Sequence, residues 1–411
     1  MNNVSKRRAF GAIAGFSAIA LAFGTALPAQ ASASELRIGA IIPLTGSLSY
    51  LSPPQIAGLH MAVDEINAAG GVMRKKVVLT IQDSGDGTTL NIADQSATKA
   101  LASGVDVVIG AAASGVTRHI INKITGAKVV QISMSNTAPD LSTWKDGGYY
   151  FRTAPSDLLQ GKIIANQILQ DASKNVAIVY VDNSYGNGLM NVAKTTLEAG
   201  KAKVTTHSFK EADTNPASTV DAALATDPDA VLLISYDEAK RVVPLFRSKG
   251  FNGSNIYFVD GNLADYSKES FASYLNGAKG TLPGKALTAS FKKRLADVYK
   301  KKTGKELTEF SYGAETYDAV MLAAIAAQAA KSATGPSIRS QITRISLTGA
   351  GKTRVTNYKA ALAALNAGRQ VNFDGVSGPV EFDRNGDPTG AFIGIYPVSY
   401  THLRAHETPE H

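Results

Sequence analysis

The sequence predicts an α/β fold in which parallel sheets are flanked by helices, arranged as two successive units. From Leu36 onward, apolar runs of strand length alternate with helical patterns, which is typical of βαβ units. The alternation breaks between Leu141 and Phe151, the run that carries the only tryptophan, and restarts at Asp157. A length of 411 residues exceeds one typical domain. Together these observations indicate two α/β units.

The individual elements follow from periodicity and from the turn residues that bound them. In the first unit we expect strands at 36–42, 77–82, 105–109 and 129–132, and helices at 55–69, 88–102 and 116–125. In the second unit we expect strands at 176–181, 203–206, 230–234 and 256–259, and helices at 157–170, 188–199, 219–224 and 238–249. Beyond Gly280 the pattern predicts helices at 290–302, 316–330, 337–345 and 357–367. Short strands at 380–382 and 392–396 close the chain around a turn at Asn385-Gly386.

The first 33 residues have the pattern of a secretory signal peptide. Lys6, Arg7 and Arg8 form a positive segment, an apolar segment of small residues follows, and two overlapping A-x-A sites end at Ala31 and Ala33. We therefore expect export through the cytoplasmic membrane to the periplasm or another extracytoplasmic place. The sequence leaves open whether the general secretory or the twin-arginine route is used.

Composition and motifs exclude several classes of function. The formal net charge is +8, but the basic residues outside the signal are scattered among acids and form no nucleic-acid stripe. The chain has no cysteine, so it has no disulfide and no thiolate metal site. The Gly-rich stretch ending at Lys352-Thr353 has Ser346 where a P-loop needs glycine, and we interpret it as a loop between helices. The histidines lie far apart, so neither a metal site nor a catalytic triad is expected.

Polar residues follow the predicted strands at the point where each strand ends. Ser114 follows strand 105–109, where small residues lead the backbone into a helix N-terminus that favours an anion. Each such residue alone is more often ordinary turn chemistry. Together they indicate a cleft, with hydroxyls for a carboxylate on one side and an acid for an ammonium group on the other: Ser114, Ser135, Thr137, Tyr185, Tyr236 and Asp260.

Several stretches resemble the periplasmic substrate-binding proteins of branched-chain amino-acid ABC importers, the leucine/isoleucine/valine-binding type. The resemblance runs from Leu36 to Tyr396. Its carriers include the stretches from Ile38 to Gly46, Ala62 to Val72, Val108 to Gly110, Thr137 to Leu141, Tyr185-Gly186 and Ser377 to Asp383.

The resemblance implies residue roles. Ser114 and Thr137 match the positions that hold the ligand carboxylate, and the backbone carbonyl of Ser135 matches one that accepts from the ammonium. Asp260 matches the acidic ammonium partner, and the aromatic positions that line the cleft match Tyr185, Tyr236 and Tyr317. Residues 51–54 depart from the family's loop, and Ala111 to Ala113 make a small pocket wall, which we expect to influence ligand size.

The resemblance also implies two Rossmann-like lobes, joined by three crossings, that close on the ligand as in type I periplasmic binding proteins. It places lobe 1 at residues 35–153 plus 281–374 and lobe 2 at residues 154–280 plus 375–396. Residues 397–411 depart from the family pattern, and we expect an artefactual or disordered tail.

The expected function is capture of an amino acid, branched-chain or related, and its delivery to an ABC permease in the membrane. We expect no catalysis, no cofactor, no metal and no nucleic-acid partner, and we expect a monomer. A periplasmic sensor for amides or small carboxylates on the same fold is the alternative. A secreted hydrolase or oxidoreductase would need a nucleophile–base pair or a cofactor motif, and the sequence has neither.

Overall fold

A computed structural model of the chain describes residues 35–398. Its first sheet is parallel and five-stranded, in the order β2-β1-β3-β4-β5. The strands are β1 (Arg37–Ile42), β2 (Val78–Asp83), β3 (Val107–Gly110), β4 (Val130–Ser133) and β5 (Tyr150–Arg152). Their β-branched and apolar residues are almost entirely buried in β1, β3 and β4, as expected for parallel strands covered on both faces.

The second sheet has six strands in the order β13-β10-β9-β8-β6-β7. They are β6 (Asn175–Val181), β7 (Lys203–Phe209), β8 (Ala230–Ile234), β9 (Ile256–Phe258), β10 (Lys279–Pro283) and β13 (Ile393–Pro397). All pairs are parallel except β10 with β13, which is antiparallel. The last strand of the chain therefore returns to a sheet whose other strands come from the middle of the sequence.

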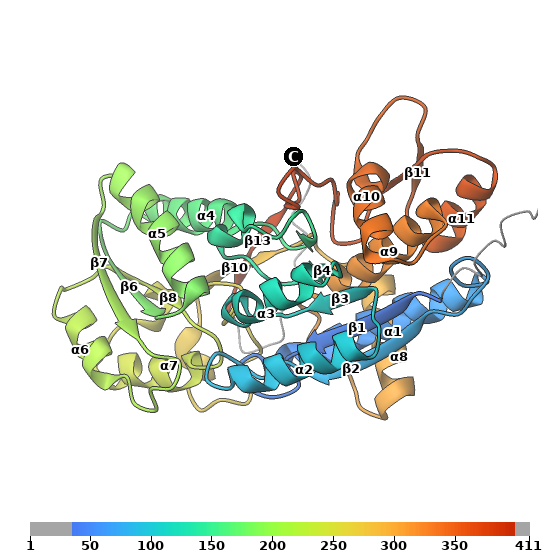
Figure 1. Ribbon diagram of the computed structural model, residues 1–411. Coiled ribbons are helices and arrows are strands. Elements are labelled where there is room, and N and C mark those ends of the chain that lie inside the picture. The colour runs from blue at the N-terminus through green and yellow to red at the C-terminus, as the bar shows by residue number, and fades with distance from the viewer. Residues whose placement is uncertain (1–34, 399–411) are drawn as a thin grey trace, which may run out of the picture. The chain divides into compact units, whose positions relative to one another are not determined.

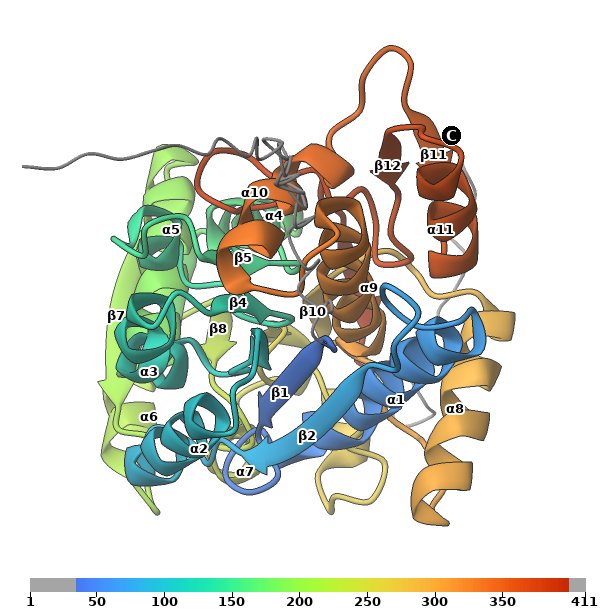
Figure 2. The same ribbon diagram turned by 45° about the vertical axis from the view of Figure 1, so that its right-hand side comes forward.

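Helices cover both sheets (Figure 1). Around the first sheet lie α1 (Ser52–Ala68), α2 (Leu90–Ala102) and α3 (Ser114–Gly126), and around the second α4 (Asp157–Gln170), α5 (Ser184–Ala199), α6 (Ala217–Leu224) and α7 (Ala239–Ser248). The later helices are α8 (Ala289–Thr303), α9 (Gly313–Ala330), α10 (Gly335–Ser346) and α11 (Tyr358–Asn366). Helices α8 and α9 both pack against α1, and Figure 2 shows α1 beside α8.

Short elements complete the chain. A separate two-stranded parallel pair consists of β11 (Thr353–Val355) and β12 (Val371–Phe373). One-turn 3₁₀ helices are η1 (Ser49–Leu51), η2 (Pro139–Thr143), η3 (Gly253–Asn255) and η4 (Ala272–Leu275). No helix within residues 35–398 combines the length and the apolar character needed to cross a membrane.

The α/β class expected from the sequence is confirmed, and most elements begin and end within a few residues of their predicted bounds. The alanine-rich stretch before Ala330 forms α9, which is buried over most of its length between α1, α10 and α11. The chain enters the second sheet at β6, leaves it after β10 and returns at β13. The predicted lobe boundaries stay a prediction, and the signal peptide lies outside the described residues.

Three expectations need correction. A strand at 380–382 does not form, because Asp383 accepts the N–H groups of Asn385 and Asp387 and turns the chain after a single bridge between Phe382 and Pro388. The Gly-rich loop before Thr353 joins helix α10 to strand β11 rather than two helices. Residues 397 and 398 do not belong to a disordered tail, because Pro397 pairs with Lys279 and Val398 is buried; residues 399–411 lie outside the described part, and the tail predicted there stays a prediction.

Candidate functional site

The turn after β3 brings Ser114 to the first residue of helix α3. Gly110 makes this turn possible: its φ is +122°, and a Cβ atom there would lie 2.0 Å from the carbonyl oxygen of Ile41. The Ser114 hydroxyl is buried and accepts a hydrogen bond from the backbone N–H of Ala138 at 3.4 Å. The helix N-terminus and this hydroxyl together form a position suited to a carboxylate.

The next strand, β4, ends in a second group of buried polar residues. The Ser135 hydroxyl donates to the carbonyl of Ala112 at 3.2 Å, and the Asn136 amide donates to the same oxygen at 2.7 Å. Thr137 is fully buried, and its carbonyl accepts from the backbone N–H of Asp157 at 2.8 Å. Its hydroxyl lies beside the Asp157 carboxyl, whose pKa it lowers as a hydrogen-bond donor, so Thr137 is directed at Asp157.

Asp260, just after β9, is the acid that faces these hydroxyls across the pocket. One of its carboxylate oxygens accepts from Tyr185 at 2.7 Å and from Gln160 at 2.6 Å, and the other accepts from Tyr312 at 2.6 Å. Burial raises the pKa of the Asp260 carboxyl, and these hydrogen bonds oppose that increase. Its hydrogen-bond donors within residues 35–398 are neutral, and no cation is paired with it there.

A second buried carboxylate, Asp157 in the first turn of α4, is linked to Asp260 through Gln160. The Gln160 amide donates to Asp157 at 3.1 Å as well as to Asp260. Burial, followed by repulsion from Asp260, raises the pKa of Asp157 well above its usual range. The two buried acids therefore hold a proton in the empty pocket, and a ligand ammonium group would stabilise both as carboxylates.

Aromatic and aliphatic side chains form the rest of the pocket. Tyr185 and Tyr236 stack with ring centroids 5.2 Å apart, and the Tyr50 hydroxyl donates to the carbonyl of Gly261 at 3.0 Å. The pocket is lined by Leu48, Leu51, Ala112, Ser114, Ser135, Tyr185, Tyr236, Asp260, Gly261 and Tyr312. Its cavity measures about 10 Å³, so these side chains must move apart before a ligand of amino-acid size can enter.

Five of the seven residues expected from the sequence thus line one pocket, whereas Thr137 contacts Asp157 and is not among the residues that line it. The seventh, Tyr317, is directed elsewhere: its hydroxyl donates to Glu65 at 2.6 Å and its ring packs edge-on against Phe291. The position we expected for Tyr317 is taken by Tyr312, whose φ of +62° is unusual for a bulky residue.

Sequence reasoning also missed Asp157, Gln160 and Tyr312. Asp157 and Gln160 lie in the first turns of an ordinary helix pattern, so no local signal separates them from solvent-facing residues. The one available signal for Tyr312 is its place in the polar break before the apolar helix α9. Of the alanines expected to set ligand size, only Ala112 lines the pocket.

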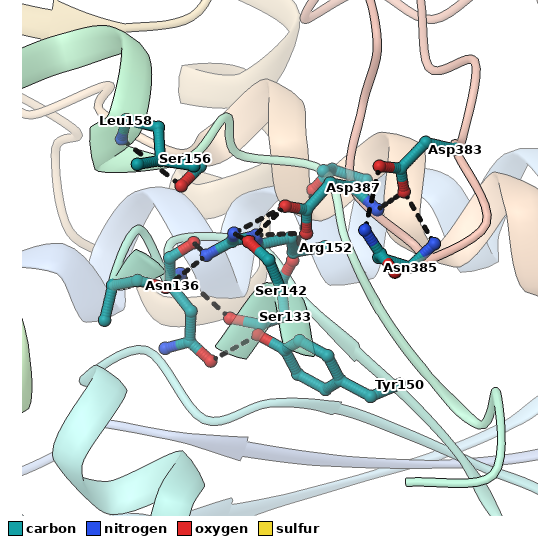
Figure 3. A network of polar contacts seen from close by, with 12 residues as sticks. Ser133, Asn136, Ser142, Tyr150, Arg152, Ser156, Leu158, Asp383, Asn385 and Asp387 are labelled. Carbon is teal, nitrogen blue, oxygen red and sulfur yellow. Dashed lines mark hydrogen bonds and ion pairs between the residues drawn. The ribbon is translucent and has the colours of Figure 1, made fainter. Parts of the chain in front are cut away.

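A separate buried network surrounds Arg152 at the end of β5 (Figure 3). Its guanidinium donates to both oxygens of Asp387 at 2.7 Å, to the Ser142 hydroxyl at 2.7 Å and to the Ala138 carbonyl at 2.9 Å. The same guanidinium contacts the Asn136 carbonyl at 3.4 Å, and the Asn136 side chain accepts from Tyr150. The network fixes the segment that carries Ser135 and Thr137.

Within residues 35–398, no group of three or more histidine or acidic side chains is arranged to hold a metal ion. The candidate site is therefore described by its hydroxyls, backbone N–H groups, tyrosines and two carboxylates. This set of groups matches the two charged ends of an α-amino acid.

Comparison with known proteins identifies the family. The family model for the periplasmic binding protein matches residues 35–393 of this chain. The chain belongs to the periplasmic binding protein family. The family is one of binding proteins, and membership implies a place outside the cytoplasm.

Individual relatives agree with this assignment. The chain is 27% identical over 365 residues to the chemotactic signal transduction system substrate-binding protein BasB of Halobacterium salinarum, covering 87% of this chain and 85% of that protein. It is 33% identical over 168 residues to the Leu/Ile/Val-binding protein BraC3 of Rhizobium johnstonii, covering 41% of this chain and 45% of that protein. The second alignment thus spans less than half of its relative.

Solved structures share the fold. The leucine-binding protein LivK of Thermotoga maritima matches with a TM-score of 0.70 at 23% identity, over 89% of this chain and 95% of that one. LivJ of Streptococcus pneumoniae, solved in complex with isoleucine, matches with a TM-score of 0.69 at 24% identity, over 90% of this chain and 98% of that one. The expectation of a periplasmic binding protein fold is confirmed.

Proposed function

We propose that this protein captures an amino acid, branched-chain or related, outside the cytoplasmic membrane and delivers it to an ABC importer. The observation that carries the proposal is that the buried carboxylate of Asp260, joined through Gln160 to a second buried carboxylate at Asp157, lines the same pocket as the hydroxyls of Ser114 and Ser135. Leucine would place its ammonium at the carboxylates and its carboxylate at the hydroxyls and the α3 N-terminus. The ammonium group would then donate hydrogen bonds to carboxylates, and the ligand carboxylate would accept hydrogen bonds from hydroxyl and N–H groups.

The charge balance of the pocket favours a zwitterion over a simple acid. A carboxylic acid without an amino group would accept hydrogen bonds at the α3 N-terminus, but it would leave the Asp157–Asp260 pair without a cation. The stacked Tyr185 and Tyr236 rings and the Leu48 and Leu51 side chains would contact the aliphatic part of the ligand. The names of the Rhizobium relative and of the isoleucine-bound structure support the same ligand class.

The test compares leucine with 4-methylpentanoate, which is leucine without its amino group. In Asp260→Ala, we expect the dissociation constant for leucine to rise by about 100-fold or more, and that for 4-methylpentanoate to change far less. Asp221→Ala, at an exposed acid paired with Lys249, is the matched control. Isothermal titration calorimetry measures each constant, and thermal unfolding checks that each variant folds. Equal losses for both ligands would refute the assignment of Asp260 to the ammonium group.

We further propose that the two sheets belong to two lobes that close on the ligand. The proposed lobes are residues 35–153 with 281–374, and residues 154–280 with 375–396. The sheet order supports this division, because β13 joins the second sheet while α8 and α9 pack on α1. Residues 1–33 would act as a cleavable signal peptide, and the mature protein would act as a monomer without a catalytic step.

A periplasmic ligand sensor is a second candidate, and one observation favours it. The Halobacterium relative, which aligns over most of both chains, is named as part of a chemotactic signal transduction system. Deleting the gene separates the two functions: an importer component is needed for uptake of labelled leucine, whereas a sensor is needed for a behavioural or transcriptional response with uptake intact.

A further inference from the structure

Tyr312 lines a second cavity that shares no other residue with the Asp260 pocket. The cavity is open and has a volume of about 370 Å³. Its walls come from the end of β10, the segment leading to α8, the segment before α9 and one residue of β13. It therefore lies where the chain leaves the second sheet and returns to it.

The body of this cavity is apolar. Four side chains from three separate segments line it: Leu282, Leu287, Leu307 and Phe310. Leu307 is buried, whereas Leu282, Leu287 and Phe310 are partly exposed toward the cavity. A small apolar group placed here would bury surface that is otherwise in contact with water.

A buried acid without a partner side chain lines the same cavity. Glu315 in the first turn of α9 is 4% exposed, and no other side chain in residues 35–398 donates to its carboxyl. Gly284, at φ +101°, leaves room for this carboxyl, because a Cβ atom there would lie 2.2 Å from Glu315 Oε1. Burial raises the pKa of Glu315 to about 8, so at neutral pH its carboxyl carries a proton that it can donate.

Besides Tyr312 and Glu315, the titratable groups around the cavity are one tyrosine, two lysines and two acids. The Tyr396 hydroxyl has a pKa raised by burial and by Glu315, and is therefore a neutral donor. The Lys285 ammonium group has no ion pair within residues 35–398, and the Lys292 ammonium lies 5.6 Å from the centre of the Phe310 ring. The two acids at the rim already accept hydrogen bonds from the backbone: Asp265 accepts from the N–H of Ser267, and Glu309 accepts from the N–H groups of Phe310 and Ser311.

We propose that this cavity is a second small-molecule site, which takes a monocarboxylate with an apolar body. The carboxylate would accept from Lys285, Lys292 and the protonated Glu315, and the apolar body would lie against Leu282, Leu287 and Leu307. This site is distinct from the amino-acid pocket, and its occupant need not be an amino acid.

The experiment uses 4-bromobenzoate as the probe and the full mature chain saturated with leucine, so that the amino-acid pocket is filled. Anomalous diffraction from bromine should place the probe beside Lys285 and Lys292. Calorimetry of the same mixture should show binding that the double variant Lys285→Glu/Lys292→Glu weakens by at least tenfold. Lys359→Glu, at an exposed lysine of α11, is the matched charge reversal and should leave the affinity unchanged.

A pH series tests the role of Glu315. Between pH 7 and pH 9 the affinity for 4-bromobenzoate should fall in the wild type as the Glu315 carboxyl ionises, and it should stay nearly constant in Glu315→Gln. A bromine peak found only in the Asp260 pocket, no measurable binding, equal affinity in the double variant, or tighter binding of 4-bromobenzylamine would each overturn the proposal. Because leucine binding is measured separately, failure here leaves the proposed function standing.

Discussion

Arg152 and Asp260 are both buried ionisable side chains at the edges of the two sheets, and their surroundings differ. Arg152 is 0% exposed, faces a carboxylate of the opposite charge, and directs its guanidinium at three further oxygen atoms (Figure 3). Asp260 is 4% exposed and meets two tyrosines and a glutamine, all neutral. Its near neighbour Asp157 is a second buried acid, which repels it when both are ionised.

The difference separates a structural site from a binding site. The Arg152 network is complete within the protein, so it stabilises the fold and needs nothing more. The Asp260 region holds two buried acids, Asp157 and Asp260, and no cation within residues 35–398 forms an ion pair with either. Such an arrangement is unfavourable in the empty protein and becomes favourable when a cation with several hydrogen-bond donors binds.

The largest effect should come from breaking the completed network. Arg152→Ala leaves Asp387, whose side chain is 15% exposed, without its cation and removes the donors to Ala138 and Asn136. We expect a loss of about 3–5 kcal/mol in the free energy of unfolding, which is typical of a broken buried ion pair. Urea unfolding measures this loss. Arg37→Ala, at an exposed pair with Glu35, is the control and should cost less than about 1 kcal/mol. Similar losses in both variants would contradict a structural role for the Arg152 network.

Asp157→Asn should have the opposite effect on stability. Because burial raises the pKa of Asp157, the folded state holds its proton more tightly than the unfolded state, and stability falls as the pH rises from the ordinary value through the raised one. Removing the acid should therefore stabilise the empty protein at pH 7 by about 1–3 kcal/mol. Thermal unfolding at pH 4 and pH 7 measures the effect, which should vanish at the lower pH.

The same variant should weaken leucine binding by about tenfold, because the ligand ammonium loses one of two carboxylates. Glu198→Gln, at an exposed acid of α5, is the control for a general change in charge. A variant that is more stable but binds leucine as tightly as the wild type would show that Asp157 has no part in the site.

Leucine affinity should also depend on pH. The raised pKa values of Asp157 and Asp260 mean that the empty pocket holds a proton which the ligand ammonium displaces. The dissociation constant should rise as the pH falls, by at most about tenfold per unit for one proton. Calorimetry in buffers of different ionisation enthalpy should detect proton release on binding.

One nearby acid could mimic this pH dependence. Burial raises the pKa of Glu238, which accepts from the N–H of Tyr236, to about 7. Glu238→Gln is therefore the control, and it should keep the proton release that Asp157→Asn reduces. If proton release disappeared only in Glu238→Gln, the proton would come from Glu238 and not from the Asp157–Asp260 pair.

Much of the fold could be predicted because strand and helix periodicity are local. Helix α4 at Asp157–Gln170 and strand β8 at Ala230–Ile234 have the predicted bounds. Strands β5, β11 and β12 are too short, at three residues each, for any period to be visible. Strand β10 was missed because its sequence, Lys-Gly-Thr-Leu-Pro, carries two residues that usually interrupt strands.

The candidate site also contains residues that local sequence patterns predict and residues that they do not. Ser114, Tyr236 and Asp260 follow predicted strands. Because the carboxyl ends of parallel strands lie at the same edge of a sheet, their place in the sequence was enough to predict a shared site. The contact of Gln160 with Asp260 joins residues 100 positions apart, and that of Tyr312 with Asp260 joins residues 52 apart. Such pairs depend on the packing of whole elements, which no local pattern encodes.

The smallest effect should come from a contact that joins segments of the two sheets. Glu211, after β7, accepts from the Ser47 hydroxyl at 3.0 Å and from the Gly87 N–H at 3.2 Å, both in loops of the first sheet. Like Asp260, this acid has donors from both proposed lobes, since Asn183 also donates to it at 3.2 Å. If the lobes open to release ligand, Glu211→Gln should raise the dissociation rate of leucine by roughly two- to fivefold, since weakening a partly buried charged hydrogen bond costs under about 1 kcal/mol. Stopped-flow fluorescence measures the rate. The association rate should change less, because the contact forms only after the ligand has entered. A change confined to the association rate would contradict a role for Glu211 in holding the pocket closed.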